Sequence, residues 1–306
     1  WYRKDYWYRF AWPLYGVSIA LLLSVLVIGE EVNGARRWIN LAGIQFQPSE
    51  IAKFTMILLF ARLTRLYGQD AKTFRHGVLG FGLALLGILV PLALEKHLSA
   101  IMLMGMVAVV MMFVAGTRTR WLLAGAGAAA LFVVVYISFM GYAGDRVTAW
   151  LHPELDPGDT GYQILQSLYA IGSGGLFGLG YGKSRQKYLY LPFQYNDYIF
   201  AVICEELGLV GAMAIVALFA VTILRGYWIA LNARDRFSTV LAAGLVTLIA
   251  VQTILNLCVV TNLLPSTGIA LPFFSYGGTA LAVNLGEMGI VLGISRGRNR
   301  RKIQEA

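Results

Sequence analysis

Residues 77–116 read GVLGFGLALLGILVPLALEKHLSAIMLMGMVAVVMMFVAG, and this stretch decides the fold class. It holds two apolar runs, 77–94 and 98–115, separated only by Glu95, Lys96 and His97. A bilayer has a hydrocarbon core about 30 Å thick, which an α-helix of roughly 20 apolar residues can cross. The stretch therefore predicts two membrane-spanning helices joined by a short polar turn.

Similar runs recur along nearly the whole chain of 306 residues. Hydrophobic residues make up 58% of the chain and charged residues 13%, against about 45–50% and about 25% in soluble domains. This composition excludes a soluble globular enzyme. We predict an all-α fold, a polytopic membrane helix bundle forming a single domain over residues 1–306. Its eight predicted transmembrane helices lie at about 11–29, 50–67, 77–94, 98–115, 120–139, 198–224, 238–261 and 279–295.

The formal net charge of +9 has an explanation in membrane orientation. Most Lys and Arg residues lie in the N-terminal WYRKDYWYR, in every second connection and after the last predicted span. Connections rich in Lys and Arg remain on the cytoplasmic side of a membrane. We therefore predict that both ends of the chain are cytoplasmic and that it has no nucleic-acid partner.

Two connections on the opposite, outward side are too long to be simple turns, at about 30–49 and 140–197. Within the second, residues 162–178 read YQILQSLYAIGSGGLFG and mix apolar positions with Gln, Ser and several Gly. This segment is too polar for a lipid-facing span, so we expect a short interfacial or re-entrant helix in a large extracytoplasmic loop.

Ionisable residues near the ends of two predicted spans are candidates for function. Glu50 and Lys53 are three residues apart and share one helix face, which fits either an interfacial ion pair or a pair facing a polar cavity. Asp197 opens the sixth span, where it fits both a helix cap and a group at the outer mouth of the bundle. Glu205 lies eight residues later and can face the same cavity.

Cations on the outward side oppose the local charge bias, which suggests that they have a purpose. Arg37 precedes the second span, and Lys183 and Lys187 follow the glycine-rich GSGGLFGLGYG. Exposed backbone N–H groups beside Lys and Arg suit a diphosphate, although packing of a flexible loop explains the glycines equally well. Pro and Gly interrupt residues 261–280, which we interpret as a cavity wall. Glu287, in the last span, needs a buried partner that the sequence does not identify.

Four ordered motifs together resemble the SEDS family (shape, elongation, division and sporulation; FtsW/SpoVE/RodA-like). They are NGARRWINLAGIQFQPSEIAKF at 33–54, DTGYQILQSLYAIGSGGLFGLGYGKS at 159–184, NDYIFAVICEELG at 196–208 and VTNLLPSTGIALPFFSYGGTAL at 260–281. Family members have ten membrane helices, so the resemblance implies that the first two are absent from this sequence. The chain departs from frequent family patterns at Phe193, where a glutamate is common, and at His97, where an aspartate is usual.

The resemblance implies a peptidoglycan glycosyltransferase of the bacterial cytoplasmic (inner) membrane. Its substrates would be lipid II and the growing glycan strand, and its partner a class B penicillin-binding protein, with membrane lipid around it. It also implies that the family's essential outer-loop acid corresponds to Asp197. The sequence shows no evident cofactor. A divalent cation remains possible, and its ligands are unknown.

Joining an α-linked sugar diphosphate into a β-linked polymer inverts the anomeric carbon, which requires one base and stabilisation of the leaving diphosphate. We assign Asp197 as the general base. The substrate-binding candidates are Arg37, Lys53, Glu50, Lys183, Lys187, Glu205, Ser275 and Tyr276. Of these, Glu50 would hold Lys53, and Ser275 with Tyr276 would line the far cavity wall.

Two other functions use the same polar residues. A lipid II flippase would carry the headgroup across the membrane, and a noncatalytic scaffold would only position a penicillin-binding protein. A flippase moves labelled lipid II between leaflets without forming glycan chains. A scaffold would keep supporting growth after Asp197→Ala.

Overall fold

A computed structural model describes residues 3–32, 35–41, 44–127, 148–155, 160–188, 190–192 and 194–304. The chain divides into two compact units. The first comprises Trp1–Ala126, Ile223–Val251 and Gly277–Ala306, and the second comprises Gly127–Thr222 and Gln252–Tyr276. The single domain over 1–306 stays a prediction. Phe193, most of the span expected at 120–139 and part of the 140–197 loop lie outside the described residues.

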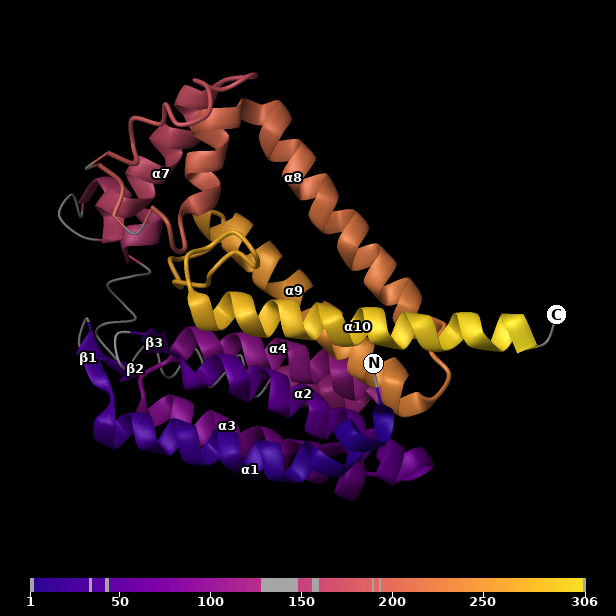
Figure 1. The fold of residues 1–306 in the computed structure, drawn as a ribbon. Helices are drawn as coiled ribbons and strands as arrows, with labels where there is room; N and C mark the ends of the chain where they lie inside the picture. Colours follow the sequence, from indigo (N-terminus) through magenta and orange to yellow (C-terminus); the bar gives the residue numbers. More distant parts are fainter. Residues whose placement is uncertain are drawn as a thin grey trace. The chain divides into compact units, whose positions relative to one another are not determined.

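The first unit is built around helix α2 (Pro48–Tyr67). Helices that pack on α2 include α1 (Lys4–Ile28), α3 (Phe81–Leu94), α4 (Leu98–Val114) and α10 (Gly278–Gln304). A π-helical turn (Arg75–Gly80) leads into α3. Helices α1 to α4 run alongside one another in Figure 1. Because neighbours surround α2, most of its side chains are buried, including Glu50 and Lys53.

A small three-stranded antiparallel sheet precedes α2, which the prediction of an all-α fold did not include. Its strands are β1 (Glu30–Val32), β2 (Ala35–Leu41) and β3 (Ile44–Phe46), in the order β1-β2-β3. The register pairs Glu30 with Trp38 and Ile39 with Phe46. The pairing satisfies the backbone of a connection that was expected to be irregular. Strand β2 also packs on α1 and α2, and β3 packs on α10.

The second unit contains α7 (Thr160–Gly174), the first part of α8 (Ile199–Leu231) and the end of α9 (Arg236–Val260). A short 3-10 helix (Pro153–Leu155) precedes α7. The Ser167 hydroxyl donates to the carbonyl of Val260 at 2.8 Å, which ties α7 to the end of α9. Helix α7 is the short helix expected within the 140–197 loop.

Five helical segments of the described chain are long and apolar enough to cross a membrane. They are Lys4–Ile28, Arg75–Leu94, Ile199–Leu231, Arg236–Val260 and Gly278–Gly297. Helix α4 is apolar but shorter, and α2 has 20 residues with four charges, Glu50, Lys53, Arg62 and Arg65. The segment expected at 120–139 is helical from 119 to 127. The chain is thus a polytopic membrane helix bundle, and eight spans stays a prediction.

Candidate functional site

Glu50 and Lys53 form a buried ion pair at the beginning of α2. Pro48 occupies the first helical turn, and the spacing of three residues brings Lys53 Nζ within 2.8 Å of Glu50 Oε1. The side chains are only 5% and 12% exposed for Lys53 and Glu50. A lysine that extended to the membrane surface would have an exposed amine, so burial favours the pair facing the interior.

Glu287 on α10 belongs to the same region. It is 1% exposed, and neither carboxylate oxygen has a hydrogen-bond partner among the described residues. Helix α10 packs on α2, and the charges of Lys53 and Glu50 both act on the Glu287 carboxyl. Glu287 therefore lies within electrostatic reach of a lysine that is already paired with another carboxylate.

The turn between α3 and α4 adds two further ionisable groups beside Arg37 of β2. Arg37 Nη2 donates to the carbonyl of Lys96 at 2.6 Å. Burial raises the pKa of Glu95 to about 8, although the positive charge of Arg37 acts in the opposite direction. Burial lowers the pKa of His97 to about 3, and the charges of Arg37 and Lys53 lower it further. Both groups are therefore mostly neutral near pH 7.

We call this set the α2 cluster: Arg37, Glu50, Lys53, Glu95, His97 and Glu287. Buried polar atoms nearly always have hydrogen-bond partners. Here partners are lacking within the described chain for Ser49 Oγ, Glu95 Oε1, His97 Nδ1 and both carboxylate oxygens of Glu287. Such a concentration of unsatisfied groups is typical of a place where a polar ligand or water completes the hydrogen bonding. The sequence analysis missed Glu95 and His97 as members, although charges between two apolar runs were a visible signal.

In the second unit, Asp197 lies two residues before α8 and is half-buried. Its carbonyl oxygen accepts a hydrogen bond from Asn256 Nδ2 at 2.7 Å, and the same amide nitrogen donates to Ile269 at 2.8 Å. Gly268 has a φ of +66°, and a Cβ there would lie 3.6 Å from Asp197 Oδ2. The positive φ, rather than a lack of space, favours glycine at this position, and the 268–276 turn borders the Asp197 carboxylate.

The two residues expected to line the cavity wall lie beside Asp197. Ser275 Oγ donates to the carbonyl of Asn196 at 2.5 Å and accepts from the backbone N–H of Leu271 at 2.7 Å. The backbone N–H of Tyr276 donates to the carbonyl of Tyr195 at 2.7 Å, and Tyr276 is 81% exposed. These contacts fix the backbone of the two residues before Asp197, which restricts where its carboxylate can point.

The glycine-rich segment 172–180 packs backbone against backbone on a kink in α8. At Gly208, φ is +65° and interrupts the helix. Leu179 and Gly180 donate N–H groups to the carbonyls of Glu205 and Glu206 at 2.9 and 3.0 Å. A Cβ on Gly178 would lie 2.1 Å from the carbonyl oxygen of Glu206. These glycines therefore permit close packing, the alternative that the sequence left open.

Glu205 and Glu206 direct their carboxylates into the following loop. Glu205 accepts from the backbone N–H groups of Arg185 and Gln186, at 2.9 and 3.3 Å, and from the Ser184 hydroxyl. Glu206 accepts from the N–H groups of Gly182 and Ser184, at 2.9 and 3.3 Å. Two internal carboxylates thus occupy N–H donors that the sequence analysis offered to a diphosphate.

Lys187 shares this arrangement. Its Nζ lies 2.7 Å from Glu206 Oε1, and this hydrogen bond raises the pKa of Lys187. Lys183 is exposed on the same loop. We use the name carboxylate loop for residues 182–186 and Lys187 together with the two carboxylates that they surround, Glu205 and Glu206. It holds more negative charge, and less free cationic charge, than the sequence interpretation assumed.

The predicted site residues thus form two groups. Arg37, Glu50 and Lys53 lie together in the first unit, whereas Asp197, Ser275 and Tyr276 lie together in the second. That these two groups form one active site stays a prediction. Among the described residues there is no group of three His, Cys, Asp or Glu side chains that could hold a metal ion.

Comparisons with known proteins assign the family. The profile of the cell cycle protein family FtsW/RodA/SpoVE matches residues 3–300. The chain is 42% identical over 304 residues to the probable peptidoglycan glycosyltransferase FtsW of Trichlorobacter lovleyi, covering 96% of this chain and 78% of the relative. It is 40% identical over 298 residues to the stage V sporulation protein E of Bacillus subtilis, covering 95% and 81%.

Solved structures agree with the sequence relatives. One, described as "Structural coordination of polymerization and crosslinking by a peptidoglycan synthase complex", matches with a TM-score of 0.83 at 32% identity, covering 97% of this chain and 84% of the other. The rod shape determining protein RodA of Thermus thermophilus matches with a TM-score of 0.69 at 30% identity, covering 96% and 80%. The expected resemblance is confirmed: this chain belongs to the FtsW/RodA/SpoVE family, also called SEDS.

Proposed function

We propose that the chain is an inverting glycosyltransferase that polymerises lipid II into β-1,4 glycan strands. The family match over 3–300, with relatives named peptidoglycan glycosyltransferases, supports this activity. The observation that carries the mechanism is the position of Asp197, a carboxylate whose backbone is held by Asn256 and whose side chain faces a glycine turn. A carboxylate fixed in this way suits general-base catalysis.

In this mechanism, Asp197 takes the proton from the 4-hydroxyl of one sugar as that oxygen attacks the anomeric carbon of the other. The bond to the diphosphate breaks on the opposite face, and the diphosphate leaves with the electron pair. Because a diphosphate is already a stable anion, it needs positive charge more than a proton donor. One carboxylate with nearby cations is therefore sufficient.

We assign the cationic role to Arg37 and Lys53. Lys53 is buried and Arg37 is half-buried, which excludes much of the water that would weaken their attraction for a phosphate. Glu50 holds Lys53 in position, and Glu287 provides a second carboxylate within its electrostatic reach.

The remaining candidates have supporting roles in this proposal. Ser275 and Tyr276 border Asp197 and would contact the sugar, since Tyr276 is exposed. Lys183 is an exposed cation of the carboxylate loop and would meet the diphosphate directly. Glu205 and Lys187 would act indirectly, by holding the loop that presents Lys183.

The reaction would take place on the outer face of the bacterial cytoplasmic membrane, with both ends of the chain cytoplasmic. A class B penicillin-binding protein is the proposed partner. The similar structure described as a peptidoglycan synthase complex couples polymerization to crosslinking, which supports a partner that forms crosslinks.

The test is polymerisation of fluorescent lipid II by the purified protein, with Asp197→Asn and Asp70→Asn compared at equal thermal stability. Asp70 is an exposed aspartate in a 3-10 turn and serves as the matched control. A general base contributes about 10²–10⁴-fold to rate, so Asp197→Asn is expected to lose about that much activity while Asp70→Asn keeps it. Parallel assays with Mg²⁺ and with a chelator test dependence on a divalent cation.

Three outcomes would contradict the proposal. Full activity of Asp197→Asn would remove the general-base role. Transfer of lipid II between leaflets of a vesicle without glycan formation would identify a flippase. If Asp197→Ala supported growth and neither the parent nor the variant polymerised lipid II, the chain would be a scaffold.

A further inference from the structure

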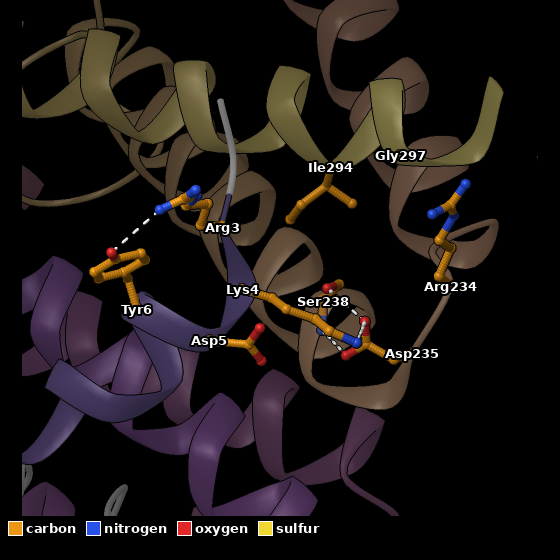
Figure 2. A pocket seen from close by; sticks show the side chains of 9 residues that line it. All are labelled: Arg3, Lys4, Asp5, Tyr6, Arg234, Asp235, Ser238, Ile294 and Gly297. Carbon is orange, nitrogen blue, oxygen red and sulfur yellow. Dashed lines mark hydrogen bonds and ion pairs between the residues drawn. The ribbon is translucent and has the colours of Figure 1, made fainter. Parts of the chain in front are cut away.

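A hollow of about 550 Å³ lies in the first unit, and none of the residues of the proposed reaction lines it. Three chain segments line it: the beginning of α1, the connection from α8 into α9, and the last part of α10. Figure 2 shows its lining side chains. They are Arg3, Lys4, Asp5, Tyr6, Arg234, Asp235, Ser238, Ile294 and Gly297. The volume is within the usual range for small-molecule sites, which is about 300–1,000 Å³.

The hollow lies where the apolar parts of α1, α9 and α10 give way to polar sequence. Each of the three helices that border it contains a segment capable of crossing a membrane. Helix α1 becomes apolar after Arg9, α9 begins at Arg236, and α10 is apolar up to Ile294 and basic after it. Exposed Tyr6, Phe10 and Trp12 follow the hollow along α1, as expected for aromatic side chains at a membrane interface. The hollow therefore lies at the depth of lipid headgroups.

Two of the cations that line the hollow, Arg3 and Arg234, have no ion-pair partner among the described residues and can therefore bind an anion. Asp235 is occupied: it accepts from the Ser238 N–H at 3.2 Å and the Ser238 hydroxyl at 3.0 Å, and it lies 3.6 Å from Lys4 Nζ. Arg3 forms no ion pair with the described residues; its guanidinium donates to the Tyr6 hydroxyl at 3.2 Å and lies over the Tyr6 ring. Arg234 forms no ion pair within the described chain.

Positive charge also exceeds negative charge around the hollow. Three cations face two carboxylates, and Arg296, next to the lining residue Gly297, is exposed. Asp5 lies in the first turn of α1, where the helix dipole stabilises its charge. Two guanidinium groups at headgroup depth, with planar donors suited to phosphate oxygens, are the groups that a lipid phosphate would contact.

We propose that this hollow binds the phosphate headgroup of an anionic phospholipid, with Arg3 and Arg234 as its ligands. The acyl chains would leave the hollow along the apolar faces of α1 and α10. Lys4 and Asp235 hold the beginnings of α1 and α9 together and keep the hollow open. The site is independent of the glycosyltransferase proposal, since none of its residues belongs to the α2 cluster or to the surroundings of Asp197.

The experiment measures binding of short-chain phosphatidylglycerol and phosphatidylcholine to the purified, detergent-solubilised chain by native mass spectrometry. We compare the parent with Arg234→Gln and Arg3→Gln. The matched control is Arg225→Gln, because Arg225 is also exposed and stacks on Trp228 at 4.0 Å rather than lining the hollow. A basic residue at the membrane surface contributes about 1 kcal/mol, so each lining variant is expected to weaken phosphatidylglycerol binding about fivefold.

Gly297→Leu provides a second variant that removes no charge. A Cβ at this position would lie 3.9 Å from Cδ and Nε of Arg234, so a leucine side chain would fill the hollow. We expect it to weaken phosphatidylglycerol binding as the arginine variants do, with Arg225→Gln unchanged. Equal binding of phosphatidylcholine, or loss in Arg225→Gln as large as in Arg234→Gln, would overturn the proposal. Displacement by millimolar glycerol phosphate would show that a free phosphate, and not a lipid, is the ligand.

Discussion

In the sequence, the α2 cluster and the carboxylate loop have the same pattern of acids beside cations on the outward side. In the structure, they differ in whether their polar groups have hydrogen-bond partners. In the carboxylate loop, four backbone N–H groups, a hydroxyl and Lys187 surround two carboxylates, so negative charge is satisfied by the protein itself. Within the described part of the α2 cluster, two carboxylates and a histidine keep buried polar atoms without partners.

The difference indicates which region is structural and which is prepared for a ligand. A charge that is fully hydrogen-bonded within the protein would lose those bonds on binding something else. A buried group without partners gains them when a ligand arrives. We therefore expect the carboxylate loop to act mainly through its shape, and the α2 cluster to act through direct contact.

The largest effect on stability is expected from Lys53→Met. The change leaves the Glu50 charge buried without its cation, and breaking a buried ion pair in this way costs about 3–5 kcal/mol. Thermal unfolding in detergent should show a large fall in the midpoint temperature. Lys187→Met is the matched control, because its Glu206 partner is similarly buried but keeps the backbone N–H donors of Gly182 and Ser184 when the lysine is removed. Equal losses in the two variants would contradict the distinction between the two regions.

A smaller, pH-dependent effect is expected from Glu95→Gln. The folded chain holds the Glu95 proton more tightly than the unfolded chain, since its pKa rises from 4.5 to about 8. The resulting stabilisation is complete below about pH 4.5 and is lost as the pH rises to 8. Glutamine cannot ionise, so the midpoint temperature of the variant relative to the parent should increase between pH 5 and pH 8 and then level off.

His97 changes stability in the other direction and can be separated from Glu95. Its pKa falls from 6.5 to about 3, so its contribution to stability is complete above pH 6.5 and is lost as the pH falls toward 3.

The control for the Glu95→Gln measurement is Glu154→Gln, because the Glu154 side chain is 65% exposed. A constant difference between Glu95→Gln and the parent from pH 5 to pH 8 would disprove the burial argument.

The sequence predicted the parts of the fold that depend on local patterns. Apolar runs located the described helices, although α1 begins well before its predicted span and α8 and α10 end well after theirs, and the spacing of three residues predicted the contact between Glu50 and Lys53. The small sheet was missed because its strands are short and pair across turns within a connection that was treated as a loop.

The parts that could not be predicted depend on contacts between distant residues. Glu205 and Glu206 reach donors that precede them by 19 to 24 residues, so nothing in the glycine-rich motif itself shows that its N–H groups are occupied. Glu287 is far from Lys53 in sequence, and only the packing of α10 on α2 brings them into the same region. Asp197 came from the family resemblance, while its contacts with Asn256 and the 268–276 turn came from the structure.

The smallest effect is expected from Glu206→Gln in the carboxylate loop. Glutamine keeps one acceptor oxygen but places an NH₂ group where the carboxylate accepted either from Gly182 or from both Ser184 and Lys187, so at least one donor loses its partner. The cost should be about 1–3 kcal/mol, and it should appear as faster proteolysis within residues 181–188. Lys183→Gln, on the same exposed loop, is the control and should be cleaved at the parent's rate. If Glu206→Gln were cleaved no faster than Lys183→Gln, the carboxylates would not be what holds this loop, and its N–H groups would again be available to a diphosphate.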